Sequence, residues 1–214
     1  EEFSLLAFVQ GEKVYPMVIS QDHKRVFEGD KGPNTGGMGA YSPVPHISPE
    51  IIRLGVEKIL KPAASGMVKN GTPFTGILYA GVITDFKKVK VIEFNARFGD
   101  PETQVILPRL KSSLADIITD LLENKEPEIT WKKEASFGVV VCAKGYPGPY
   151  EKGMTLPDFS SNKENIYYAG VKEEDKQLKA SGGRVFLVQS CGENLKEAKD
   201  KVYESLENLS LDKM

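Results

Sequence analysis

The 214-residue sequence is poor in the residues that mark disulfide scaffolds and metal clusters, with only two cysteines and two histidines. Cys142 and Cys191 stand in apolar, strand-like runs without a Cys-x-x-Cys spacing or a nearby histidine cluster. We therefore expect buried, reduced thiols, and neither a disulfide framework nor a zinc site. Reduced thiols are typical of a reducing compartment, which predicts a cytoplasmic location.

Long apolar runs and an excess of one sign of charge are absent too. No run approaches the roughly 18 apolar residues that a membrane helix needs, and no charged-then-apolar leader opens the sequence. We therefore expect no membrane partner. The formal net charge is -2, so no basic excess favours a nucleic-acid partner. What remains is the composition of a globular protein that is long enough to bury a core.

The first residues show strand-like alternation without an initial methionine. We therefore expect a piece of a longer protein that begins within a domain. Residues 3–9 and 13–19 read as two strands, and Gln10-Gly11-Glu12 between them is typical of a hairpin connection.

A long irregular segment is expected after this hairpin, over residues 22–44, which are rich in glycine and proline. A helix follows Ser48, its expected N-cap, and Pro62 should kink that helix. Residues 74–84 and 89–94 then read as two further strands.

Two helix starts come after these strands. Asp100-Pro101-Glu102 combines a capping residue, a proline and an acidic first turn, which predicts a helix as far as Pro108. Ser113-Leu114-Ala115-Asp116 is a capping-box pattern and predicts a second helix through Leu122.

A change in composition over residues 124–133 indicates a linker between two units. We place the boundary at Trp131, which divides the chain into residues 1–131 and residues 132–214. The second unit is expected to be a small α+β domain that ends in an amphipathic helix. Its strand patterns occupy residues 136–143, 166–171 and 184–190, and the apolar stripe of the helix comprises Leu195, Ala198, Val202, Leu206 and Leu209.

Polar residues at the end of the strand 89–94 are the most informative feature of the sequence. Because residues two apart in a strand share a face, we expect Glu93, Asn95 and Arg97 to project together. The first two supply the hard oxygen ligands that suit Mg²⁺, and the arginine can hold a phosphate by a forked pair of hydrogen bonds. The alternative is a solvated outer face on which Glu93 and Arg97 form a surface ion pair.

Glycine is concentrated in residues 29–40, where five of them occur. Such a segment can turn backbone N–H groups toward an anion such as phosphate or a carboxylate. It lacks the Gly-Lys-Ser/Thr ending of a Walker loop and does not open a helix. A flexible surface loop is the alternative. Just upstream, Asp22-His23-Lys24-Arg25 can position a phosphate and an amine together, or form a solvated turn.

Taken together, these motifs resemble those of the phosphoribosylamine-glycine ligase family. The matching runs are residues 22–25, 32–41, 76–81 and 93–102. The similarity continues through residues 145–148 and 182–185, so it covers nearly the whole chain. Other ATP-grasp ligases share the Glu-x-Asn pattern but differ in the residues that follow it, here Ala96 to Glu102.

The resemblance implies an α+β fold. Residues 1–131 would be the C-terminal lobe of an ATP-grasp fold, mostly antiparallel sheet with helices, and a small α+β C-terminal domain would follow. The missing N-terminal half of the same enzyme would supply the other wall of the ATP cleft, so the chain is expected to be inactive alone. The strand 76–83 carries no carboxylate where many ATP-grasp enzymes place another metal ligand, so it does not support a second protein-held metal.

The resemblance also implies ATP-dependent ligation of glycine to 5-phosphoribosylamine in purine biosynthesis. The glycine carboxylate would attack the γ-phosphate to give glycyl phosphate and ADP, and the amine would then displace phosphate to form glycinamide ribonucleotide. The implied cofactors are ATP and Mg²⁺ (or Mn²⁺). Such phosphoryl transfer depends on positioning and charge neutralisation.

Roles for individual residues follow from the same resemblance. Glu93 and Asn95 would hold the metal, Arg97 would steady the transferred phosphoryl group, and Asp100 would orient the amine, although a helix N-cap explains Asp100 equally well. The implied binding residues are Glu2, Lys24 and Arg25 for ATP, and Asp22, Asn34, Thr35, Gly36 and Gly37 for the substrates.

Two other functions stay open. An ATP-grasp ligase that joins a different acid and amine would keep the fold, but residues 97–102 together with 22–25 favour the glycine ligase. A non-catalytic nucleotide-binding module is the other alternative, which Mg-dependent nucleotide affinity of the chain would help to assess.

Overall fold

The computed structural model describes residues 1–211 and 214, which form two compact units. The first unit comprises Glu1–Gln21 and Ser42–Lys133, and the second comprises Asp22–Tyr41 and Glu134–Met214. The composition break near Trp131 lies close to the end of the first unit. The one boundary that we expected would leave residues 22–41 in the first unit, whereas the structure places them in the second. Composition could not indicate this, because it does not show which distant strands pair.

The first unit is built on a four-stranded antiparallel sheet with the order β2-β1-β7-β8. The hairpin at the start of the chain and the two later strands confirm the strand predictions. Gly11 lies between the first two strands with φ of 58°, a left-handed conformation that glycine adopts without a steric penalty. The strands are β1 (Glu2–Gln10), β2 (Lys13–Pro16), β7 (Thr75–Thr84) and β8 (Val89–Asn95).

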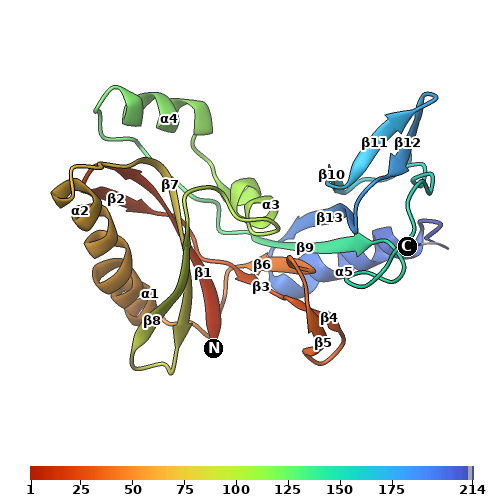
Figure 1. Ribbon diagram of the computed structural model, residues 1–214, viewed down its shortest axis with the longest axis horizontal. Coiled ribbons are helices and arrows are strands. Elements are labelled where there is room, and N and C mark those ends of the chain that lie inside the picture. Colours follow the sequence, from red (N-terminus) through yellow and green to blue (C-terminus); the bar gives the residue numbers. More distant parts are fainter. Residues whose placement is uncertain (212–213) are drawn as a thin grey trace. The chain divides into compact units, whose positions relative to one another are not determined.

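Three helical segments follow one another and lie along one face of this sheet (Figure 1). They are α1 (Pro49–Gly55), the π-helical turn η1 (Val56–Leu60) and α2 (Lys61–Lys69). Ser48 caps α1 as predicted, because its hydroxyl accepts a hydrogen bond from the Ile51 N–H at 3.4 Å. The π-helical turn ends two residues before Pro62. Proline lacks an N–H, and its ring crowds the preceding turn. The helix therefore changes its hydrogen-bond pattern close to the position where we expected a kink.

The other face of the sheet carries a hydrophobic core as well. Leu6, Phe8 and Tyr79 project from β1 and β7, and they pack with Ile106 and Ile117. Alternation along the strands explains this face, because residues two apart project to the same side. The helical segments on this side are α3 (Thr103–Ile106), the 3-10 turn η2 (Leu107–Arg109) and α4 (Leu114–Leu122).

Ser113 caps α4 as its sequence pattern predicts, with its hydroxyl accepting from the Asp116 N–H at 3.3 Å. Ser113→Ala is expected to lower the free energy of unfolding by about 1 kcal/mol, because the first turn loses an acceptor for an N–H group. Urea unfolding of the full-length protein measures this change. Ser65→Ala within α2 is the matched control, since that hydroxyl contacts the Glu12 side chain and caps no backbone group. Equal stability of the two variants would contradict the capping role.

The second unit is built on a five-stranded sheet with the order β10-β13-β9-β6-β3. Helix α5 (Leu195–Glu207) packs on β9 and β13, and Ala198 and Val202 of its predicted stripe are fully buried. The helix and the three strand patterns predicted for this unit are therefore confirmed. The strands are β3 (Gln21–Asp22), β6 (Gly39–Ser42), β9 (Ala135–Cys142), β10 (Asn165–Tyr168) and β13 (Arg184–Gly192).

The expectation of an irregular segment over residues 22–44 is wrong. Two short strands there, β4 (Arg25–Phe27) and β5 (Lys31–Asn34), form an antiparallel hairpin, and β6 joins the larger sheet. The sequence also gave no signal for the hairpin of β11 (Val171–Glu174) and β12 (Gln177–Ala180). Its turn has positive φ values of 54° at Asp175 and 61° at Lys176. Asn-Gly is the pair that usually indicates such a turn, and it is absent here.

Candidate functional site

The end of β8 carries the two predicted metal ligands. Glu93 and Asn95 lie two residues apart on one face of the strand, and the Asn95 amide donates a hydrogen bond to the Glu93 carboxylate at 3.4 Å. Glu93 is opposite Gly81 of β7, which in turn is opposite Ser4 of β1. A Cβ at Gly81 would lie 3.4 Å from the Glu93 Cγ. The glutamate stem therefore lies directly over the backbone of β7, and its carboxylate remains exposed.

This donor set fits a magnesium ion that is held partly by substrate and water. A carboxylate and an amide oxygen are hard ligands, and Mg²⁺ characteristically keeps several waters while it binds substrate phosphates. Within residues 1–211 and 214, no group of three His, Cys, Asp or Glu side chains could hold a metal ion by itself. The pair is therefore suited to a metal that arrives with a nucleotide, and less suited to a permanent structural metal.

Arg97 lies beyond the end of the strand that carries this pair, so the alternation on which the expectation depended does not extend to it. The strand ends at Asn95, and alternation of side chains holds only while the backbone stays extended. Beyond that point the Arg97 Nη1 atom donates to the Phe98 carbonyl oxygen at 2.8 Å, and the side chain is exposed. The structure thus brings Glu93 and Asn95 together and places Arg97 in the turn that follows.

Asp100 is not the N-cap of a helix, so that reading of the residue is wrong. Helix α3 begins at Thr103, and the N-cap position belongs to Glu102. The Asp100 carboxylate is exposed and accepts a hydrogen bond from the Gln104 side chain at 2.8 Å.

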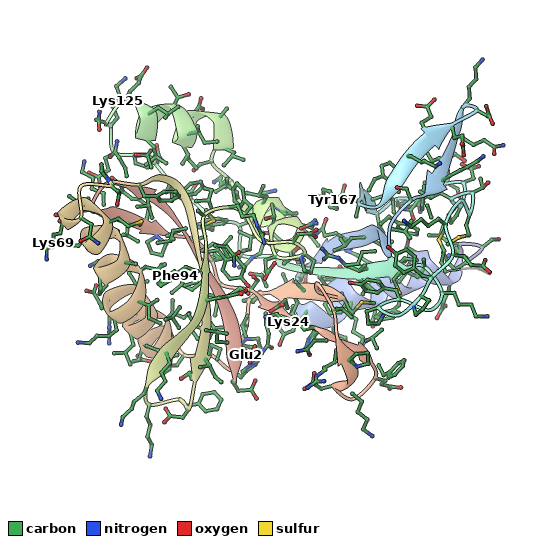
Figure 2. The ribbon with its side chains drawn as sticks, in the orientation of Figure 1. Glu2, Lys24, Lys69, Phe94, Lys125 and Tyr167 are labelled. Atoms are coloured by element: carbon green, nitrogen blue, oxygen red, sulfur yellow. The ribbon has the colours of Figure 1, made fainter. Side chains whose placement is uncertain are left out.

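Glu2, the residue predicted to contact the nucleotide ribose, begins β1 in the same unit (Figure 2). The Glu2 carbonyl oxygen accepts a hydrogen bond from the Gln21 side-chain amide at 2.7 Å, and Glu2 is exposed. In register it is opposite Ile83 of β7. Because Ser4 follows two residues later on the same strand, Glu2 and Ser4 project from the same face of the sheet.

The other predicted binding residues lie in the second unit, around the hairpin of β4 and β5. Lys24 and Asp22 form an ion pair at 3.9 Å, and the Arg25 guanidinium donates to the Gly32 carbonyl oxygen at 2.6 Å. Asn34 is opposite Arg25 in the hairpin register. These residues therefore lie near one another within this unit, and the Arg25 side chain also joins the two strands of the hairpin.

Backbone N–H groups of the glycine-rich segment do not converge on an open concavity. All four N–H groups from Thr35 to Met38 have acceptors within the protein, so the anion-binding arrangement suggested by the glycine content is not formed by them. Their acceptors are Lys24 O (2.7 Å), Tyr146 OH (3.2 Å), Thr35 Oγ1 (3.0 Å) and His23 O (2.7 Å), in chain order. Any ligand contact of Thr35 to Gly37 must therefore use side chains or carbonyl groups, and the substrate role of residues 34–37 stays a prediction.

Glycines in this segment are explained by close packing instead. A Cβ at Gly36 would lie 3.3 Å from the Arg184 guanidinium, and one at Gly39 would lie 2.5 Å from the Gly138 carbonyl oxygen. The Arg184 Nη1 atom also donates to the Gly37 carbonyl oxygen at 3.4 Å. Residues 36–39 of the segment therefore pack against β9 and β13.

The two thiols form no disulfide. Cys142 and Cys191 are free and partly exposed, where full burial was expected. Burial still raises the pKa of the Cys142 thiol, which disfavours the reactive thiolate.

In the part of the chain that the structure covers, no helix has the length and apolar character needed to cross a bilayer.

Comparison with protein families gives two matches in succession. The ATP-grasp (A) domain of phosphoribosylglycinamide synthetase matches residues 1–103, and the C domain of the same enzyme matches residues 136–214. The phosphoribosylamine-glycine ligase of Lactococcus lactis subsp. lactis is 55% identical over 214 residues, which are 99% of this chain and 52% of that protein. The ligase of Listeria innocua is 56% identical over 213 residues, 98% of this chain and 51% of that protein. The chain thus spans about half the length of these curated relatives.

Solved structures agree with this match. The crystal structure of phosphoribosylamine-glycine ligase from Thermotoga maritima superposes with a TM-score of 0.90 at 32% identity, over 100% of this chain and 54% of that chain. N5-carboxyaminoimidazole synthase from Aspergillus clavatus, solved with ADP and 5-aminoimidazole ribonucleotide, gives a TM-score of 0.62 at 12% identity, over 96% of this chain and 50% of that chain. The second likeness shows the fold alone. The predicted α+β fold of the ATP-grasp class is confirmed, and the chain belongs to the phosphoribosylglycinamide synthetase family.

Proposed function

We propose that the full-length protein uses ATP to join glycine to 5-phosphoribosylamine, and that this chain supplies its C-terminal half. The products are glycinamide ribonucleotide, ADP and phosphate. The observation that carries the proposal is the Glu93 and Asn95 pair at the end of β8, in a chain 55% identical to a phosphoribosylamine-glycine ligase. The partner it requires is the N-terminal half of the same enzyme.

The reaction consists of two steps, a phosphoryl transfer to glycine and an acyl transfer to the amine. A glycine carboxylate oxygen attacks the γ-phosphorus of ATP, and ADP leaves. The phosphoribosylamine nitrogen then attacks the carbonyl carbon of glycyl phosphate, phosphate leaves and the nitrogen loses a proton. Both steps depend on holding charged groups in line, and neither requires a covalent bond to the protein.

The first unit supplies the proposed metal-binding and phosphoryl-binding groups. Glu93 and Asn95 would hold Mg²⁺ or Mn²⁺, which neutralises phosphate charge when bound. Arg97 steadies the transferred phosphoryl group, for which its exposed planar guanidinium is suited. Asp100 orients the amine through an exposed carboxylate that Gln104 already steadies. Glu2 accepts hydrogen bonds from ribose hydroxyls of ATP.

The second unit supplies the remaining proposed contacts. Lys24 and Arg25 bind ATP, while Asp22 and the residues from Asn34 to Gly37 bind the substrates. Support comes from the closeness of charged groups beside the β4-β5 hairpin, where Asp22 and Lys24 form an ion pair and Arg25 lies opposite Asn34. We assign residues 1–131 to the ATP-grasp lobe and residues 132–214 to the C-terminal domain. Free thiols agree with a cytoplasmic location.

Activity of the full-length protein tests the proposal. ADP release is measured with glycine and freshly generated 5-phosphoribosylamine, and the product is identified by mass spectrometry. ADP release should require both substrates, and the 214-residue chain alone serves as the control. Ligation with another acid in place of glycine would show a different ATP-grasp ligase. Mg-dependent nucleotide binding without turnover would show a binding module, and either outcome contradicts the proposal.

A further inference from the structure

Glu102 is a buried carboxylate that the sequence pattern assigned only to the exposed first turn of a helix. The residue is 3% exposed, and its Oε1 atom accepts hydrogen bonds from the Tyr79 hydroxyl at 2.6 Å and the Ser4 hydroxyl at 3.1 Å. The two hydroxyls lie 3.1 Å from each other. We call these three residues the Glu102 cluster. A carboxylate is costly to bury, so its retention here requires these donors.

The Glu102 cluster lies in register with the strand positions of the proposed metal ligands. Tyr79 of β7 is directly opposite Asn95 of β8, and Ser4 of β1 is opposite Gly81, which is opposite Glu93. Residues directly opposite each other in neighbouring strands project to the same face. The hydroxyls that hold the buried carboxylate therefore share a face of the sheet with the Glu93 and Asn95 side chains.

The turn that leaves β8 is packed against the same carboxylate. A Cβ at Gly99 would lie 2.4 Å from the Glu102 Oε2 atom and 3.1 Å from the Tyr79 ring, so the close approach requires glycine. The Gly99 carbonyl oxygen accepts from the Thr103 N–H at 3.2 Å and from its hydroxyl at 2.5 Å. The turn over residues 97–100 is thus held at its last residues between the sheet and the start of α3.

We propose that Glu102 is a positioning residue of the ligase, and this inference rests on the function proposed above. Through the hydroxyls of Ser4 and Tyr79 it holds the turn 97–100 against the sheet and thereby fixes Glu93 and Asn95 at the strand end. Bonds from a hydroxyl to a carboxylate are charge-assisted and stronger than neutral ones. Residues that hold metal ligands in place without binding the metal commonly change metal affinity or activity 10- to 100-fold when they are substituted.

Two substitutions in the full-length enzyme test the proposal. Glu102→Gln keeps the size of the side chain and removes its charge, and Tyr79→Phe removes the closer donor. Each is expected to weaken Mn²⁺ binding roughly tenfold in the complex with a non-hydrolysable ATP analogue, as measured by electron paramagnetic resonance of free Mn²⁺. Each should also lower kcat by a similar factor with little change in KM for glycine. The losses of Mn²⁺ affinity in the double variant should be less than the sum of the two single losses, because both changes weaken the same charge-assisted hydrogen bond.

Matched controls separate positioning from general stability. Tyr15→Phe removes a hydroxyl from a tyrosine packed on the same core, and Glu57→Gln removes a carboxylate from an exposed helix position. Both should keep the wild-type Mn²⁺ affinity and kcat. If Tyr79→Phe also keeps both values, the proposal is overturned even where the melting temperature falls, because the cluster would then be structural only.

Two further arms keep the test decisive. If Glu102→Gln does not fold, Tyr79→Phe and Ser4→Ala decide the question, since each leaves the carboxylate one hydroxyl donor. If the wild-type protein makes no product from glycine and phosphoribosylamine, the proposed function fails. The Mn²⁺ measurement still decides the positioning role in that case, because it requires only the nucleotide complex.

Discussion

Glu93→Gln is expected to lower the kcat of the full-length enzyme roughly 100-fold, a loss of about 2.7 kcal/mol in transition-state stabilisation. The amide keeps the shape of the side chain but loses the negative charge that attracts a small dication. Charge stabilisation of a transferring phosphoryl group by a bound metal is worth several kcal/mol, so the estimate is conservative. The fold should not change, because the carboxylate is exposed and its hydrogen bond to Asn95 is long at 3.4 Å.

Steady-state kinetics over a range of Mg²⁺ concentrations measures this effect, with circular dichroism as the check on folding. Higher Mg²⁺ should recover part of the rate, because the variant still has the Asn95 oxygen as a ligand. Glu57→Gln is the control, since it removes an exposed carboxylate that pairs with Lys61 along a helix. A wild-type kcat for Glu93→Gln at limiting Mg²⁺ would refute the metal assignment.

Elements with a local cause were predictable from the sequence. Ser48 and Ser113 cap the helices they were expected to cap, because a cap joins residues three positions apart. The stripe of α5 is buried at Ala198 and Val202, since helical periodicity decides which face meets the sheet. Each of these features depends on neighbours within a few residues along the chain.

Features that depend on distant partners were not predictable. The glycine-rich residues 22–44 looked like an irregular loop, yet β6 pairs with β9, a strand that comes from beyond residue 134. Glu102 looked like an exposed acid in the first turn of a helix, yet it is buried against Ser4 of β1 and Tyr79 of β7. Burial in both cases is set by tertiary packing, which overrides the local preference.

The candidate site shows the same division. The pairing of Glu93 with Asn95 follows from alternation within a single strand and was correctly predicted. The position of Arg97 was not, because the alternation rule gives no information on where the strand ends. The amides from Thr35 to Met38 looked available from composition, but their acceptors include Tyr146, which lies far along the chain. Local periodicity therefore locates a ligand pair, and tertiary contacts decide the geometry around it.

Gly39→Ala is expected to lower the free energy of unfolding of the second unit by about 3 kcal/mol, the upper end of the usual cost of overpacking. Gly39 lies in β6, where a Cβ would be 2.5 Å from the Gly138 carbonyl oxygen and 3.5 Å from the Val139 Cα of β9. Both are backbone atoms, so no flexible side chain can move aside. The strand β9 also pairs along its length with β13, so relief of the clash must disturb that pairing.

Hydrogen exchange locates this effect in the second unit. The Val140 N–H donates to the Met38 carbonyl oxygen at 2.9 Å, directly beside the clash, so its exchange should become faster in Gly39→Ala. Gly66→Ala in α2 is the control of opposite sign, because no atom lies within 4 Å of the added Cβ. Alanine is the better helix former there, so that variant should gain about 0.5 to 1 kcal/mol. Wild-type exchange at Val140 in Gly39→Ala would contradict the close approach of β6 to β9, whereas acceleration at Val140 alone would confine the effect of the clash to this strand pair.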